Sequence, residues 1–352
     1  MIRRTPLASA RSAACLAAIA LAVGGCKISL SAAAQGAASP SAAAQSRLTP
    51  ASGAPDRLVI EPQAGFSPVY DLIQAARQTI DVVMYEFADT TAERDLAAAA
   101  RRGVLVRVIL DSTERDVNSN TYSYFRSHGV KVVWSSPSFR YTHQKTLVFD
   151  GSEAVIMTAN LTSAYYSTSR DFLVLDSSRA DVTAITAVFN ADFAHRAVRP
   201  SDGSDLVWSP TDAQARLLGL INGATSSLRV YSEEMGDTAV EDALIGAAKR
   251  GVYVQVCGEN EDGEYDSAFA RLARAGVHIS YYSSPTGFYI HGKVIEADYG
   301  SPHAKVFIGS ENFSSTSLNH NRELGLIISD PAILSAIADS FAADFRHGTH
   351  WP

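Results

Sequence analysis

The chain contains the same ordered set of reactive residues twice, and this duplication constrains its fold more than any other feature. Each copy has a histidine and a lysine separated by one residue, and four residues then separate the lysine from an aspartate. An asparagine follows, and an acid stands eleven positions after it. The residues are, in order, His143, Lys145, Asp150, Asn160 and Asp171, and then His291, Lys293, Asp298, Asn312 and Glu323.

The duplication extends well beyond these residues, as expected for two copies of one structural unit. A shift of 148 residues places 80–86 over 228–234, and Glu86 and Glu234 then end matching apolar runs. The same shift places 100–104 over 248–252. After the second motif the shift becomes 152, so the second copy carries four extra residues near 299–303, where we expect a hairpin tip. The sequence therefore predicts two tandem repeats related by a pseudo-two-fold axis.

Within each copy, apolar runs of strand length alternate with stretches of helical period. This pattern predicts an α/β fold with a mixed sheet and α-β-α layers. Asp150-Gly151 between two apolar runs indicates a hairpin. We place repeat 1 at 56–203 and repeat 2 at 204–352, with a link at 200–205. The predicted helices of the first copy are 67–76, 91–102, 119–128 and 182–195, its strands are 80–87, 104–110, 130–134, 144–149, 154–158 and 172–175, and the second copy runs from a helix at 212–222 to a helix at 331–345.

The first 55 residues do not fit this repeat. Arginines at 3, 4 and 11 precede an apolar run at 13–23 that is short for a membrane span, which favours a signal segment at 1–25. Small residues directly before Cys26 resemble a bacterial lipobox, so we expect Cys26 to be lipidated. Cleavage of an ordinary secretory signal after Ala34 is the alternative. Residues 26–55 are rich in Ala, Ser, Gln, Pro and Gly and read as a disordered tether. The expected product is an exported, membrane-anchored lipoprotein facing the periplasm or the exterior.

Charge and cysteine content limit the classes of function. The formal net charge is −7, which argues against a broad, non-specific grip on nucleic acid. Of three cysteines, only Cys257 falls in the expected folded part, inside an apolar run. A disulfide framework is therefore not expected, and Cys257 reads as a small core residue.

A histidine beside a lysine, delivered twice, suits a phosphate diester. If 144–149 is a strand, alternation puts His143 and Lys145 on one face and Gln144 on the other. One histidine can attack phosphorus and the other can protonate the leaving group, while the lysines attract the phosphoryl oxygens. One copy cannot act on both sides of an in-line displacement, but two copies facing one cleft can. A metal site is disfavoured because a lysine, not a second ligand, accompanies each histidine.

The combined pattern is similar to the motif of the phospholipase D superfamily. In the second copy the match continues through Gly309-Ser310-Glu311-Asn312, with a longer spacer before the glycine. The first copy departs from it with Met157-Thr158-Ala159-Asn160, where Thr158 keeps a hydroxyl in place of serine. The resemblance covers the chain from about Asp56 to its C-terminus.

The resemblance implies a role for each motif residue. One histidine forms a phosphohistidine intermediate; we assign this to His143, and the acid and base steps to His291. Four side chains are expected to hold the phosphoryl oxygens, and Asp171 and Glu323 to accept a hydrogen bond from a histidine, with the pairing left open. Asp150 and Asp298 are expected to support turns, and Thr158 and Ser310 to support the site. The scheme requires no metal or other cofactor. The four oxygen-holding residues are Lys145, Lys293, Asn160 and Asn312.

The expected substrate is a phospholipid whose head group is hydrolysed or transferred, since export, a lipid anchor and an acidic body favour it. The alternative is an exported, metal-independent nuclease that cleaves DNA or RNA. A third reading, a binding protein without activity, is disfavoured because both copies keep the histidine, lysine and asparagine. We expect a monomer, since one chain supplies both halves of the site.

The proposed anchor gives a direct test. Replacing Cys26 by serine removes the thiol that would carry the lipid, so we expect most of the protein to move from the membrane to the soluble fraction. The measurement is an immunoblot of fractionated cells. Unchanged fractionation of Cys26→Ser would rule out the lipid anchor.

Overall fold

The computed structural model describes residues 56–283 and 287–352. The expected signal segment at 1–25, the tether at 26–55 and the lipid anchor at Cys26 lie outside the described residues. The described part falls in one compact unit.

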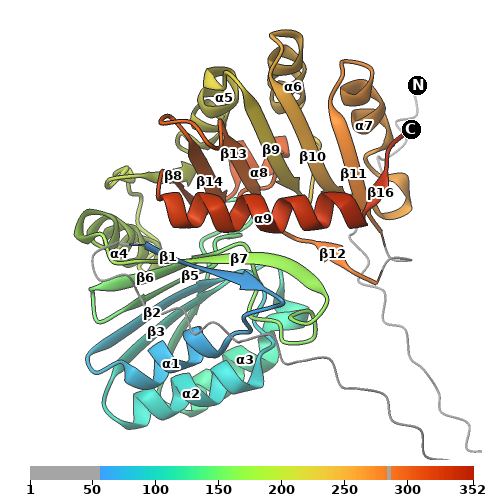
Figure 1. Cartoon of the computed structure of the whole chain (residues 1–352). Coiled ribbons are helices and arrows are strands. Elements are labelled where there is room, and N and C mark those ends of the chain that lie inside the picture. Colours follow the sequence, from blue (N-terminus) through green and yellow to red (C-terminus); the bar gives the residue numbers. More distant parts are fainter. Residues whose placement is uncertain (1–55, 284–286) are drawn as a thin grey trace, which may run out of the picture. The chain divides into compact units, whose positions relative to one another are not determined.

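The first half of the described chain builds a mixed sheet with strand order β1-β7-β6-β5-β2-β3-β4 (Figure 1). The strands β2, β3 and β4 are parallel, and the others pair antiparallel. The short strand β12 from the second half adds to β7. Its elements are β1 (Asp56–Glu61), α1 (Ser67–Ala75), β2 (Thr79–Met84), α2 (Thr90–Arg101), β3 (Leu105–Leu110), α3 (Arg115–Ser127), β4 (Lys131–Trp134), β5 (Thr146–Phe149), β6 (Glu153–Met157), β7 (Ser169–Asp176), α4 (Arg179–Phe193) and β12 (Tyr289–Ile290).

The second half repeats this arrangement. Its sheet has the order β16-β11-β10-β9-β13-β14-β15-β8, again with three parallel strands, β9, β10 and β11. Its elements are β8 (Leu206–Ser209), α5 (Ala213–Gly223), β9 (Ser227–Ser232), α6 (Thr238–Lys249), β10 (Tyr253–Glu259), the short 3-10 helix η1 (Glu261–Gly263), α7 (Asp266–Ala273), β11 (His278–Tyr282), β13 (Val294–Ala297), β14 (Lys305–Gly309), α8 (Ser315–His320), β15 (Glu323–Ile328), α9 (Pro331–His347) and β16 (Thr349–His350).

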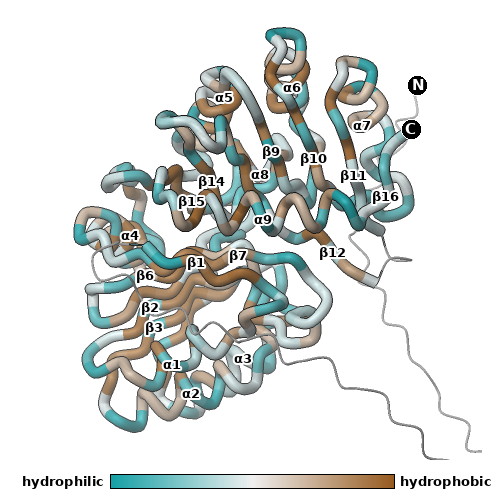
Figure 2. The backbone as a smooth tube through the Cα atoms, viewed as in Figure 1, coloured by the Kyte–Doolittle hydropathy of each residue, from teal (hydrophilic) through white to brown (hydrophobic). Residues whose placement is uncertain are grey.

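Three layers of buried apolar side chains hold these elements together. The most hydrophobic residues lie largely in the strands (Figure 2). The outer layers lie between α1–α3 and the first sheet, and between α5–α7 and the second. The middle layer joins the inner faces of both sheets with α4 and α9. Because both sheets are covered on two faces, strands such as β7 are buried along their whole length. Where both faces of a strand are covered, its central residues form a continuous apolar run, as residues 172–175 do in β7.

The predicted fold class is confirmed: the protein is α/β, with layered mixed sheets and two like repeats. The hairpin at Asp150-Gly151 joins β5 to β6, and both turn residues have positive φ. The four extra residues of the second copy lie in the connection from β13 to β14, as expected. Cys257 is a free, buried cysteine in the apolar middle layer.

Some element boundaries were wrong. The strand expected from Gln144 begins at Thr146, so His143 and Lys145 precede the regular strand β5. Helix α3 begins at Arg115, four residues before the expected start. The strands β1 and β8 were not predicted, because short edge strands lack a long alternating pattern.

Two matching buried ion pairs fasten the repeats to each other. Arg170 on β7 donates two hydrogen bonds to Asp344 on α9, at 2.6 and 2.9 Å. Arg322, directly before β15, donates one hydrogen bond from Nη2 to Asp192 Oδ1 on α4 at 3.3 Å, and its Nε lies 2.9 Å from Asp192 Oδ2. In both pairs the arginine and the aspartate come from different repeats, and all four residues are buried.

No helix in the described part is long and apolar enough to span a membrane.

The buried pairs predict a large loss of stability when one partner is removed. In Asp344→Ala the guanidinium of Arg170 stays buried without its counter-charge, which costs about 3–5 kcal/mol of unfolding free energy. Urea denaturation of the purified proteins measures this loss of unfolding free energy. The control is Arg57→Ala, which removes an exposed ion pair with Glu153 and costs less than about 1 kcal/mol. Equal losses in the two variants would contradict a clamping role for Arg170 and Asp344.

Candidate active site

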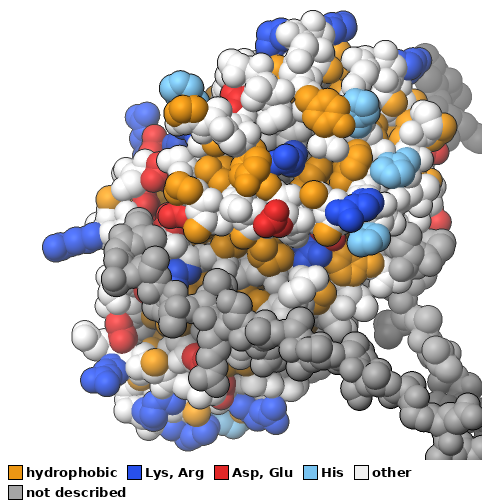
Figure 3. Space-filling model, viewed as in Figure 1, with side chains coloured by type: hydrophobic (Ala, Val, Ile, Leu, Met, Phe, Trp, Pro, Cys, Tyr) orange, Lys and Arg blue, Asp and Glu red, His pale blue; other side chains and the backbone are white. Residues whose placement is uncertain are grey.

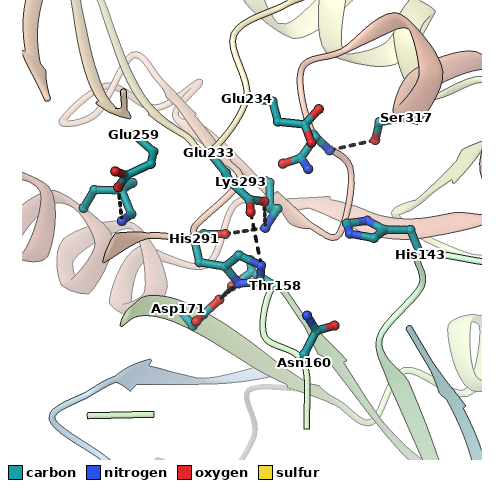
Figure 4. A network of polar contacts seen from close by, with 12 residues as sticks. His143, Thr158, Asn160, Asp171, Glu233, Glu234, Glu259, His291, Lys293 and Ser317 are labelled. Carbon is teal, nitrogen blue, oxygen red and sulfur yellow. Dashed lines mark hydrogen bonds and ion pairs between the residues drawn. The ribbon is translucent and has the colours of Figure 1, made fainter. Parts of the chain in front are cut away.

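Each motif histidine is hydrogen-bonded to the acid of the other repeat. His143 Nδ1 lies 2.8 Å from Glu323 Oε2, and His291 Nδ1 lies 2.7 Å from Asp171 Oδ1. Figure 4 shows His291 with Asp171, and His143 facing the same region from the other side. Since a carboxylate accepts, each Nδ1 carries the hydrogen and each Nε2 is left for chemistry. The side chains are only 12% and 13% exposed, so the approach to these nitrogens is narrow.

Short strand contacts between the repeats create this crossed pairing. Strand β12 lies parallel to the start of β7, with Ile290 opposite Arg170. His291 follows Ile290, and Asp171 follows Arg170. The pairing of the two strands therefore brings the carboxylate of Asp171 to the imidazole ring of His291. The matching contact in the other direction is an isolated bridge between Thr142 and Arg322.

Two further carboxyl groups hold the histidine segments from the opposite side. Asp111, after β3, accepts a 2.6 Å hydrogen bond from the backbone N–H of Thr142. Glu259, at the end of β10, accepts a 2.9 Å bond from the N–H of Ile290. Burial raises the pKa of Glu259 to about 7. The residue before each histidine is thus fixed between the two repeats.

Both motif lysines are fully buried, and each points back to its own histidine. Lys145 Nζ donates to the carbonyl oxygen of His143 at 2.7 Å, and Lys293 Nζ donates to that of His291 at 2.5 Å. Burial and the charge of Lys293 lower the pKa of Lys145 to about 7.

The charge state of the His143 pair suits a nucleophile. Burial lowers the pKa of His143, so its ring is neutral at neutral pH. Burial alone would raise the pKa of Glu323, but the interaction with His143, including its hydrogen bond, and the charge of Lys145 hold that pKa below its ordinary value. A neutral ring that donates from Nδ1 presents an unprotonated Nε2.

The two asparagines lie at the site but have different neighbours. Asn160 Nδ2 donates to Glu86 Oε2 at 3.3 Å. The backbone N–H of Asn312 donates to Ser317 Oγ at 2.8 Å. Their side-chain oxygens are buried and have no hydrogen-bond partner within the described residues.

The hydroxyls of Thr158 and Ser310 lie at matching places beside the acid-bearing strands. Thr158 Oγ1 accepts from the N–H of Phe172 at 3.0 Å and donates to Asp171 Oδ1 at 2.6 Å. Ser310 Oγ accepts the matching bond from Leu324 N–H at 3.2 Å.

Besides His143, two side chains donate hydrogen bonds to Glu323: Ser317 Oγ at 2.5 Å and Asn321 Nδ2 at 2.9 Å. Sequence reasoning missed both residues, because the shift of 152 places them over Tyr165 and Ser169, so neither is repeated between the two copies.

Asp150 and Asp298 lie at the hairpin turns, away from the histidines. Asp150 accepts hydrogen bonds from the N–H groups of 77–79, and Asp298 accepts from those of 225–227. These backbone bonds outweigh the effect of burial and lower the pKa of Asp298 to about 2. Each aspartate thus ties its hairpin to the loop before β2 or β9.

A residue outside the motif completes the second half. Glu233, directly after β9, lies with Oε2 2.5 Å from Lys293 Nζ and Oε1 3.5 Å from His291 Nε2 (Figure 4). Sequence reasoning singled out its neighbour Glu234 instead. The signal was available, since the aligned residue in the first copy is Tyr85, a change from aromatic to acidic.

Taken together, the described residues offer a neutral histidine, a second histidine between two carboxylates, and two buried ammonium groups. No cluster of three or more His, Cys, Asp or Glu side chains suited to a metal ion occurs among the residues placed by the structure. The arrangement can bind an anion and transfer a proton across it.

Comparison with known proteins places both repeats in one family. The model described as "Cardiolipin synthase, PLD-like domain" matches residues 69–193 and 217–345. The mitochondrial cardiolipin hydrolase of Xenopus tropicalis is 27% identical over 126 residues, 36% of this chain and 60% of that protein. The chain therefore matches less than two thirds of this relative's length.

Two solved structures share the fold across most of the chain. The phosphatidylserine synthase of Haemophilus influenzae has a TM-score of 0.66 at 11% identity, covering 84% of this chain and 86% of its own. The polyphosphate kinase of Porphyromonas gingivalis has a TM-score of 0.65 at 17% identity, covering 82% of this chain and 50% of its own. At such identities these likenesses show the fold alone.

The pKa of Lys145 predicts how anion binding depends on pH. Because a lysine loses its charge as the pH rises through its pKa, the affinity for sulfate is expected to fall above about pH 7. Calorimetric titration with sulfate, whose charge is constant in this range, measures it. Lys145→Arg keeps its charge and serves as the control, with no such fall expected. A pH-independent affinity in the unchanged protein would show that Lys145 stays charged.

Proposed function

The chain belongs to the family of phospholipase D-like domains described as cardiolipin synthase, and from this membership we propose that it hydrolyses or transfers the head group of a phospholipid. The family implies an enzyme that acts on phosphodiesters. The crossed histidine–acid pairs carry the proposal, because they turn two Nε2 atoms from separate repeats toward one site. Such a pair can attack phosphorus on one side and protonate an oxygen on the other.

The first step forms a phosphohistidine. The lone pair of His143 Nε2 attacks phosphorus, the P–N bond forms, and the P–O bond to the leaving alcohol breaks. The proton on His291 Nε2 passes to the departing oxygen. Lys145 and Lys293 offset the charge on the phosphoryl oxygens, and the amide groups of Asn160 and Asn312 bind them.

The second step releases the product. Water gives a proton to His291 while its oxygen attacks phosphorus, and the P–N bond breaks with its electron pair returning to His143. An alcohol in place of water would give head-group transfer by the same route. Glu323 and Asp171 keep both rings in one tautomer throughout.

A lipid substrate is favoured over nucleic acid by charge. Glu233 carries an ionised carboxylate at the site, because the charges of His291 and Lys293 overcome the effect of burial and hold its pKa well below the usual range. On the face shown in Figure 3, lysine and arginine side chains gather along the lower edge and are scattered, with acidic side chains among them, over the rest. A polyanion gains little from the scattered part of this surface. The matched cardiolipin hydrolase is, by name, a phospholipid enzyme.

The substrate test compares two diesters in the presence of a chelator. We expect release of head group from phosphatidylethanolamine vesicles and no degradation of plasmid DNA. Degradation of DNA without release of head group would replace this proposal by the nuclease alternative.

The two-histidine scheme predicts that either histidine is indispensable. His143→Ala and His291→Ala should each lower turnover by about 10³-fold or more, since the two rings act in sequence on one phosphorus. The matched control is His303→Ala at an exposed position in the β13–β14 connection, which should keep the original rate. Near-original turnover in either motif variant would refute the scheme.

A further inference from the structure

One aligned position beside the two histidines carries residues of different chemistry in the two halves of the site. A shift of 148 residues places Tyr85 over Glu233, at the ends of the matching strands β2 and β9. The neighbours of the two residues also match. Tyr85 contacts Tyr141, His143 and Lys145, and Glu233 contacts Tyr289, His291 and Lys293. Within this group of contacts the neighbours are therefore equivalent, and the chemistry of the central side chain changes.

In the second half, Glu233 binds all three of its neighbours through its carboxylate. Oε2 pairs with Lys293 Nζ at 2.5 Å, and Oε1 accepts a hydrogen bond from Tyr289 Oη at 2.9 Å. Oε1 also lies 3.5 Å from His291 Nε2. With Asp171 at Nδ1, both ring nitrogens of His291 face carboxylate oxygens. This is the environment of a doubly protonated ring, because both nitrogens then donate.

In the first half, no carboxylate takes that place. The ring of Tyr85 meets the ring of His143 edge-on, with centroids 4.5 Å apart, and Lys145 Nζ lies 5.1 Å from the Tyr85 ring centre. The Tyr85 hydroxyl points away and donates to Glu114 at 2.8 Å. Since an aromatic ring does not accept a proton, Glu323 is the one carboxylate partner of His143 within residues 56–283 and 287–352, and His143 Nε2 can stay unprotonated.

We propose that Glu233 is a positioning residue that keeps the proton on His291 Nε2 and thereby makes His291 the acid and His143 the nucleophile. The inference rests on the proposed function. It adds the residue that sets the direction of the reaction in an otherwise two-fold scaffold. The proton that Glu233 holds on the ring is the one that passes to the leaving oxygen, and the carboxylate itself stays ionised through that transfer.

The leaving group provides the test. p-Nitrophenolate departs without a proton, whereas an alkanol requires one, so the two kinds of diester separate acid catalysis from all other effects. The probes are bis(p-nitrophenyl) phosphate, read as the first burst of p-nitrophenolate, and two alkyl diesters, phosphatidylethanolamine vesicles and a dinucleotide. Failure of the original protein on all three probes would overturn the proposed function itself.

The main variant is Glu233→Gln, which keeps the size of the side chain and removes its charge. We expect turnover of the alkyl diester to fall by about 10²–10³-fold, within the range of general acid catalysis. The burst with bis(p-nitrophenyl) phosphate should change by less than about threefold, as an order-of-magnitude limit on effects other than proton transfer. Glu153→Gln, at an exposed ion pair, is the matched control and should leave both rates unchanged.

The outcomes separate the possible roles of Glu233. Equal losses on both kinds of diester, with a smaller burst amplitude, would show a structural role and overturn the proposal. Equal gains would show that the carboxylate obstructs the site, which would also overturn it.

A second variant tests the direction independently. Tyr85→Glu gives the first half the carboxylate of the second, so His143 Nε2 should be held protonated and the burst should be lost. In His291→Ala treated with bis(p-nitrophenyl) phosphate, the phosphoryl label should accumulate on the peptide that contains His143. A label on the His291 peptide in His143→Ala, without one in His291→Ala, would reverse the assignment.

Discussion

The hydrogen bond from a histidine of one repeat to the acid of the other is the interaction on which the rest of the structure depends. It forms only if β12 lies along β7 and if Thr142 reaches Arg322. Those contacts require the inner faces of both sheets to share one apolar layer. The crossed ion pairs of Arg170 and Arg322 stabilise the same arrangement. The same contacts between the repeats therefore determine both how the repeats pack and where the histidines and their acids lie.

Much of the fold was predictable because it depends on local pattern. Apolar periodicity located most helices and strands, and the doubled motif indicated two like repeats. The crossed pairing of Asp171 and Glu323 was not predictable, since a sequence with two equivalent acids is equally compatible with pairing inside a repeat. The choice is made by strand contacts between residues about 120 to 180 positions apart. Tertiary contacts of this kind leave no periodic signal.

The overlooked residue, Glu233, has a different explanation. Glu233 and Glu234 are adjacent at the end of β9, and neighbouring side chains of a strand point to opposite sides. Which of them contacts Lys293 depends on where the strand ends, and strand ends are poorly defined by sequence. Alignment of the two copies favoured Glu234, because it matches Glu86. The functional difference lies instead at the position where the copies disagree.

The exchange of acids between repeats also has a consequence for biosynthesis. When a ribosome has produced only the first repeat, His143 lacks its hydrogen-bond partner Glu323, and Asp171 lacks its partner His291. Neither half holds a complete pair, so the nascent polypeptide has no reactive centre until β15, close to the carboxyl end, has been made and folded into place. An enzyme that attacks phosphodiesters would in this way stay inert among the nucleic acids and lipids of the compartment where it is translated.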